Sequence, residues 1–164
     1  MNLKPLKTAG LVSLVMGILF ALTGLVTWGV ITSQLSAERI TTTPDSFLPN
    51  VPVNNPIAAL AQADIINTHA LKASNGLTYA ELGAEATKAK NAGDTAKAEE
   101  LTKARTTVMN GSFLRASLFT SVLSYGVALF ALGVGLTLAI LGWALYKVGG
   151  QTVTARATEG AVRV

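Results

Sequence analysis

Two long stretches of apolar and small residues along this chain contain no charged side chain. They cover residues 8–37 and 116–146, and the second lies between Arg115 and Lys147. Each stretch is about 30 residues long, whereas a helix needs only about 20 mainly apolar residues to cross a bilayer. The first is also too long for the apolar core of a signal peptide, which has about 7–15 residues. The pattern therefore predicts a membrane protein with two transmembrane helices.

The polar segment between the stretches shows no pattern typical of β-strands. We therefore expect an all-α membrane protein. Transmembrane helices over residues 9–33 and 113–147 would form an antiparallel hairpin. Residues 34–112 would form a helical extracytoplasmic loop domain, and residues 1–8 and 148–164 would be cytoplasmic.

The loop begins with a proline-rich segment over residues 41–52. Its prolines prevent a helix because proline lacks an N–H donor and clashes with the preceding turn. We expect an extended arm, whose apolar side chains Phe47, Leu48 and Val51 pack against another surface.

Local signals then predict helices in the rest of the loop. Asn55 before Pro56 is a typical helix start, and a helix over residues 57–73 would end at the following Asn-Gly pair. Thr78 and Glu81 have the spacing of a capping box, which predicts a second helix to about Lys90.

A third helix would start after Asp94 and end near Met109. The pair Asn110-Gly111 favours a break there, because both residues are common at helix C-termini. Ser112 would then cap a separate second transmembrane helix.

The net charge of +4 comes from the ends of the chain and not from the loop, which is close to neutral. This distribution gives no indication of nucleic-acid binding. Positive residues near membrane spans favour the cytoplasmic side, so both termini would be cytoplasmic and the loop would face outward. The terminal positive residues are Lys4, Lys7, Lys147, Arg156 and Arg163.

Small residues recur along one face of each apolar stretch, at a spacing of three or four residues. Small side chains let membrane helices approach closely, and this spacing favours a left-handed crossing near +20°. The faces would pack on one another or on a foreign subunit, although Gly, Ala and Ser are also simply common in membrane helices. They comprise Gly10, Ser13, Gly17, Ala21 and Gly24 in the first stretch, and Ser121, Ser124, Ala128, Ala131, Gly135, Ala139 and Gly142 in the second.

Residues that could carry chemistry are few. The chain has no cysteine and a single histidine, His69, whereas a catalytic zinc site usually has three protein ligands. No pair of carboxylates has a spacing that suggests acid–base chemistry, and no phosphate-binding or nucleophile motif is present. We therefore predict no catalytic, metal or cofactor site.

The segments AQADIINTHALKASNGLTYAEL (residues 61–82) and RTTVMNGSFLRASLFTSV (residues 105–122) resemble a family of small two-span actinobacterial membrane proteins. The resemblance is weakest over residues 85–102. Members are often labelled as aromatic ring-opening dioxygenases, but the lone His69 cannot build an iron site with two histidines. Some actinobacterial proteins of this build accompany the respiratory cytochrome bcc–oxidase supercomplex, so the resemblance implies a place in such an assembly.

These observations predict a non-enzymatic accessory subunit of a larger complex in the plasma (inner) membrane. Its partners would be the lipid bilayer and other integral membrane subunits. Outside the membrane, Phe47, Leu48, Val51 and Ile57 would contact a partner. The alternative is a membrane-anchored sensor, or an envelope protein that binds a ligand or lipid.

Overall fold

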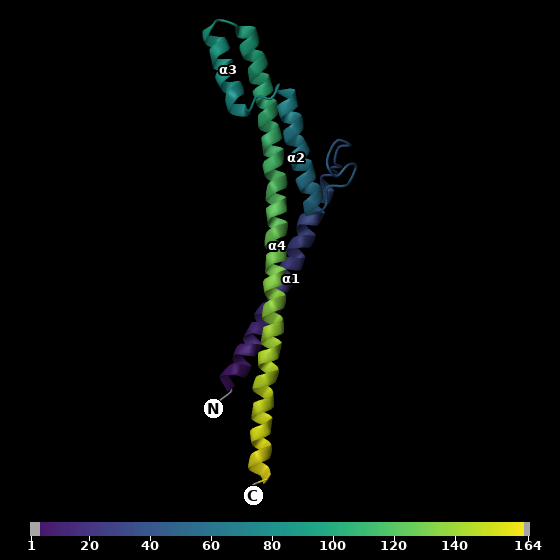
Figure 1. Ribbon diagram of the computed structural model, residues 1–164, viewed down its shortest axis with the longest axis vertical. Coiled ribbons are helices and arrows are strands. Elements are labelled where there is room, and N and C mark those ends of the chain that lie inside the picture. The colour runs from purple at the N-terminus through teal and green to yellow at the C-terminus, as the bar shows by residue number, and fades with distance from the viewer. Residues whose placement is uncertain (1–3, 163–164) are drawn as a thin grey trace. The chain divides into compact units, whose positions relative to one another are not determined.

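The computed structural model describes the backbone of residues 4–162 and the side chains of residues 4–150. Two of the positive residues near the C-terminus are affected: Arg163 and the side chain of Arg156 lie outside this range. The described chain forms four helices and no strand, with one isolated β-bridge between Thr41 and Pro52 (Figure 1). The all-helical prediction is therefore confirmed. The helices are α1 (Lys4–Ala37), α2 (Pro56–Ala73), α3 (Tyr79–Asn91) and α4 (Thr95–Val162).

The chain divides into two compact units, residues 1–30 with 124–164 and residues 31–123. We call these the span unit and the loop unit. In the span unit, α1 and the C-terminal part of α4 lie side by side (Figure 1).

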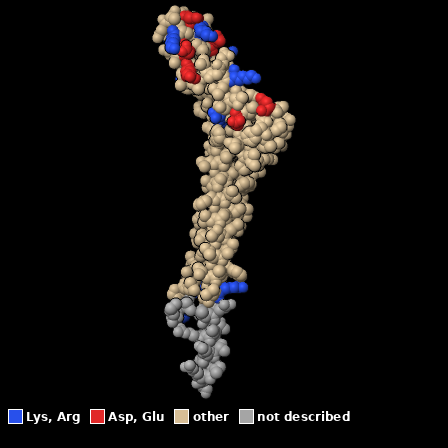
Figure 2. Space-filling model, viewed as in Figure 1, with Lys and Arg blue, Asp and Glu red and all other residues tan. Residues whose placement is uncertain are grey.

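Both α1 and α4 are long and apolar enough to cross a membrane. Only 17% of the most apolar window of each helix is buried, so neither resembles the core helix of a soluble protein. Large side chains such as Val26, Phe130 and Ile140 point outward instead. On the face drawn in Figure 2, charged side chains are absent from most of the described surface of these helices. The two helices thus expose the kind of surface that lipid covers.

Glycines bring α1 and α4 into direct backbone contact. A Cβ atom added to Gly10 would lie 2.5 Å from the Tyr146 nitrogen, and one on Gly24 would lie 2.6 Å from the Ala128 oxygen. At Gly17 it would lie 2.6 Å from the Gly135 oxygen. Real Cβ atoms do not approach backbone atoms so closely, so any larger residue would push the helices apart.

The register of this contact is regular. Gly10 lies against Gly142, and Gly17 against Gly135. Residue numbers rise along α1 as they fall along α4, so the helices run antiparallel. The contacts recur every seven residues, which is the repeat of left-handed helix packing. The Ser13 hydroxyl adds a hydrogen bond of 3.0 Å to the carbonyl oxygen of Leu138.

Most of the small residues singled out in the sequence lie at or beside this contact. A Cβ on Gly135 would meet the backbone of Ala21, and one on Gly17 would meet that of Ala139. Ala128 is buried, whereas Ser124 and Ala131 are half-buried. Ser121 belongs to the loop unit, and its hydroxyl donates to Ser117 of its own helix.

In the loop unit, the helix ends follow from local capping. The Asn55 side chain accepts hydrogen bonds from the amides of Ile57 and Ala58, at 3.1 and 2.9 Å. Both partners of the Thr78–Glu81 capping box are in place. The turn after α2 has positive φ at Asn75 and at the glycine that follows it. These predicted helix starts and stops are therefore confirmed.

The predicted break at Asn110-Gly111 is wrong, because α4 continues without interruption through both residues. A Cβ on Gly111 would lie 3.3 Å from the Cβ of Ala70, so this glycine provides space for α2 instead of ending a helix. The Ser112 hydroxyl donates to the Val108 carbonyl of the same helix and caps nothing.

Replacing Gly135 or Gly142 by leucine should separate α1 from α4, because the new side chains would overlap backbone atoms of α1. Overpacking of this kind costs about 1–3 kcal/mol or more. Since the chain has no native cysteine, Ser13→Cys with Leu138→Cys provides a disulfide readout without background. We expect the cross-link to fall sharply in both variants.

Gly133→Leu is the matched control, since a Cβ there meets nothing within 4 Å. It should leave the cross-link at the level of the unmodified pair. Equal cross-linking in the Gly133 and Gly135 variants would contradict the contact.

Candidate functional site

The loop unit contains the side chains that the sequence predicts to meet a partner. Its first element is the arm, residues 40–53, which is folded and not simply extended. The arm closes through a hydrogen bond from the Val53 amide to the Ile40 carbonyl, at 2.9 Å. Thr42, which is buried, organises its interior: the Thr42 hydroxyl accepts from the Val51 amide at 2.9 Å and donates to the Leu48 carbonyl.

Two contacts fasten the arm to α2. The Ser46 hydroxyl donates to the Ala61 carbonyl at 3.5 Å. The Nε2 atom of His69 lies 2.7 Å from a carboxylate oxygen of Asp45, and both side chains are about half exposed. No local pattern predicts this pair, because Asp45 lies 24 residues before the histidine. The single histidine thus forms a side-chain hydrogen bond at the surface that links the arm to α2.

The four residues predicted to contact a partner are not equally available. Phe47 and Ile57 are 60% and 62% exposed, whereas Leu48 and Val51 are half-buried within the arm. A partner could therefore reach Phe47 and Ile57. Val51 serves mainly to close the arm on Thr42.

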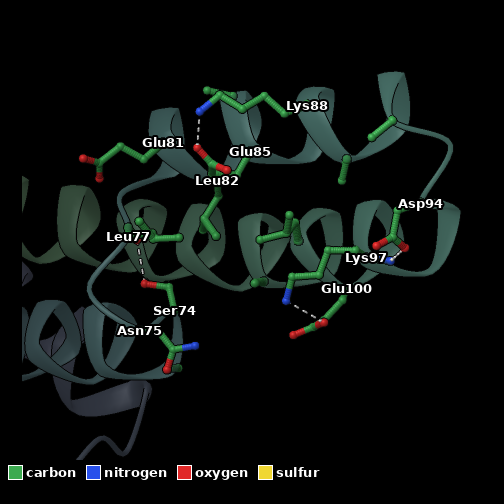
Figure 3. Close-up of a pocket in the computed structure, with 16 residues that line it drawn as sticks. Ser74, Asn75, Leu77, Glu81, Leu82, Glu85, Lys88, Asp94, Lys97 and Glu100 are labelled. Atoms are coloured by element: carbon green, nitrogen blue, oxygen red, sulfur yellow. Dashed lines mark hydrogen bonds and ion pairs between the residues drawn. The ribbon is translucent and has the colours of Figure 1, made fainter.

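A groove of about 700 Å³ lies between the end of α2, α3 and the start of α4 (Figure 3). Its apolar lining includes Leu77, Leu82 and Leu101. Four of its charged side chains pair with one another along their own helices. Lys88 lies 2.5 Å from Glu85, and Lys97 lies 3.0 Å from Glu100.

The remaining carboxylates of the groove cap helices. Asp94 accepts a hydrogen bond from the Lys97 amide at 3.0 Å, and Glu81 accepts from the Thr78 amide at 2.8 Å. The amide and hydroxyl of Thr78 lower the pKa of Glu81 below its usual value. Over residues 4–150, no group of three or more His, Cys, Asp or Glu side chains is arranged to hold a metal ion. The charges of the groove therefore stabilise helices and do not converge on a reacting centre.

Arg105 connects α4 to α3 beside this groove. Its guanidinium carbon lies 4.0 Å from the centre of the Tyr79 ring, a favourable cation–π contact. The absence of a side chain at Gly83 makes room for it, since a Cβ there would lie 3.1 Å from Nε. The buried Nε atom has no hydrogen-bond partner within the described part of the chain, so packing on the ring must compensate for its burial.

The fold and surfaces together define an all-helical protein with two helices long and apolar enough to cross a membrane. No protein-family model, curated protein or solved structure matches this chain. The resemblance to two-span actinobacterial proteins stays a prediction.

The Asp45–His69 contact predicts how Asp45 titrates. Hydrogen bonding to His69, and to a smaller extent to Thr43, lowers the pKa of Asp45 from 3.8 to about 2. A carboxylate whose pKa is lower in the folded than in the unfolded protein stabilises the fold at pH values above its unfolded pKa. This stabilisation is lost as the pH falls toward 2. In the His69→Ala variant, the Asp45 midpoint should rise toward 3.8, measured by carboxyl-carbon NMR.

Glu81 is an internal control, because its pKa depends on Thr78 and not on the histidine. Its midpoint should be the same in both proteins. An Asp45 midpoint that does not move in His69→Ala would rule out the pair.

Proposed function

We propose that this protein is a non-enzymatic integral membrane subunit of a larger membrane protein complex. In this proposal α1 and α4 form a transmembrane hairpin in the plasma membrane, with both termini cytoplasmic and the loop unit outside. The resemblance described above favours a respiratory assembly of the cytochrome bcc–oxidase type as the complex.

The observation that carries the proposal is the length of apolar surface on α4. The uncharged stretch from Arg115 to Lys147 is about 48 Å long at 1.5 Å per residue. The hydrocarbon core is about 30 Å thick, and membrane helices tilt by at most about 40°. Even at that tilt the stretch spans about 37 Å along the membrane normal. Tilting alone therefore cannot bury it in the hydrocarbon core.

Side chains at the C-terminal end of the uncharged stretch indicate which part of α4 would extend beyond the hydrocarbon core. The ammonium group of Lys147 lies 4.4 Å from the centre of the Trp143 ring, a combination typical of the membrane interface. With Trp143 at the interface, the excess falls at the Arg115 end of α4. Phe119 and Leu123 are exposed there, so apolar side chains continue beyond the hydrocarbon.

The loop unit exposes further large apolar side chains. Phe113 is 66% exposed, and Leu114 is exposed beside it on the same helix. Neither the protein core nor the hydrocarbon covers these residues, and exposed apolar surface of this kind is typical of interaction sites. Another protein subunit that borders the outer membrane surface would cover them, together with Phe47 and Ile57.

The groove between α3 and α4 supports a second candidate function, the binding of a small ligand by a membrane-anchored sensor. Its volume of about 700 Å³ is in the usual range for ligand sites. A ligand that raises the thermal stability of wild-type protein, but not of an Ala89→Trp variant that fills the groove, would favour this function.

Metal analysis provides a separate test of ring-opening chemistry, for which iron near one equivalent would be required.

A photo-crosslinking amino acid at Phe119 or Phe113 should form an adduct with one defined membrane subunit in native membranes. The same group at Lys103, an exposed position on α4 nearer its start, should not form this adduct. Replacing both phenylalanines by serine should reduce recovery of the subunit in gentle detergent at least about 25-fold, if they contribute about 2 kcal/mol.

Equal labelling from all three positions would contradict a specific interface. Recovery of a lone, monodisperse chain from native membranes, without any adduct, would overturn the proposed function.

A further inference from the structure

We propose that the span unit binds one anionic phospholipid in a groove along α1, with the lipid headgroup at Lys4. The groove is open on one side and has a volume of about 900 Å³. The inference rests on the membrane insertion proposed above, but not on the partner subunit. The residues that define the groove for this argument are Lys4, Val12, Ser13, Met16, Phe20 and Leu138.

The lining of the groove suits an acyl chain. Val12, Met16 and Phe20 expose apolar side chains along it. The Ser13 hydroxyl is already occupied by the Leu138 carbonyl at 3.0 Å. The middle of the groove therefore offers an occupant apolar contact and little hydrogen bonding.

The length of the groove distinguishes a lipid from a partner helix. Its lining on α1 extends from Lys4 to Phe20, or about 24 Å along the helix. One leaflet with its headgroups is about 20–22 Å thick, half of a bilayer of about 40–45 Å. The groove therefore starts at headgroup depth and ends near the bilayer centre. A transmembrane helix of a partner would need a surface that continues through the second leaflet.

The charge at the open end selects an anionic headgroup. Lys4, Lys7 and Lys147 lie at this end of the span unit, and the sequence has no Asp or Glu over residues 4–30 or 124–150. The ammonium groups of Lys7 and Lys147 lie over the rings of Tyr146 and Trp143. Lys4 lines the groove itself, so a lipid bound there would have its phosphate beside this side chain.

The test is native mass spectrometry of the full chain, titrated with phosphatidylglycerol and with phosphatidylcholine of identical acyl chains. Wild-type protein should retain one phosphatidylglycerol in preference to phosphatidylcholine, and inorganic phosphate should not displace it. Lys4→Ala should weaken phosphatidylglycerol binding about fivefold, the effect of one basic residue near a membrane surface, and leave phosphatidylcholine binding unchanged. Met16→Trp should weaken binding of both lipids by filling the groove.

Ile18→Trp is the matched control for Met16→Trp, because the two native side chains are 47% and 43% exposed and only Met16 lines the groove. It should bind both lipids like the wild type. Equal binding of the two lipids by wild-type protein, no effect of Lys4→Ala, or equal losses in the two tryptophan variants would overturn the proposal.

Alkaline carbonate extraction separates this inference from the proposed function. Release of the wild-type chain from membranes would overturn insertion, and the lipid groove with it. Lipid preference in a chain that forms no partner adduct would instead support the groove and contradict only the partner subunit.

Discussion

The span unit depends on the close approach of two helix backbones. Apolar side chains gain nothing by leaving lipid for one another, so membrane helices associate through close packing and hydrogen bonds. Gly17 and Gly135 provide that packing by letting backbone atoms touch. The same arrangement turns the large side chains outward. The exposed apolar surface of the span unit and the groove along α1 both follow from an interface made of small residues.

In the loop unit, polar contacts order the arm and the helix ends around a buried apolar core. The hydroxyl of buried Thr42 forms hydrogen bonds with backbone groups inside the arm. The Asp45–His69 contact and the Ser46 hydroxyl connect the arm to α2. Charges near α3 are used for helix caps and for pairs along single helices. These charged groups of the loop unit therefore stabilise its helices and the arm.

The sequence by itself determined the features that depend on neighbouring residues or on a simple period. Two uncharged stretches predicted the two long apolar helices, because crossing a bilayer requires length without charge. Asn55 and the Thr78–Glu81 box predicted helix starts, since a cap acts within three residues. The recurrence of small residues marked the faces of α1 and α4 that meet, because it follows the helical period.

Only the tertiary structure decided features that depend on residues far apart in the chain. Local chemistry predicted a break at Gly111, but contact with Ala70 shows that this glycine makes room for α2 within a continuous helix. The pairing of Asp45 with His69 and the stacking of Arg105 on Tyr79 have no local signal. The two small-residue faces alone could not show that α1 would pack on α4 and not on another subunit. Such contacts form only when the chain folds back on itself, and for that reason the sequence pattern could not specify them.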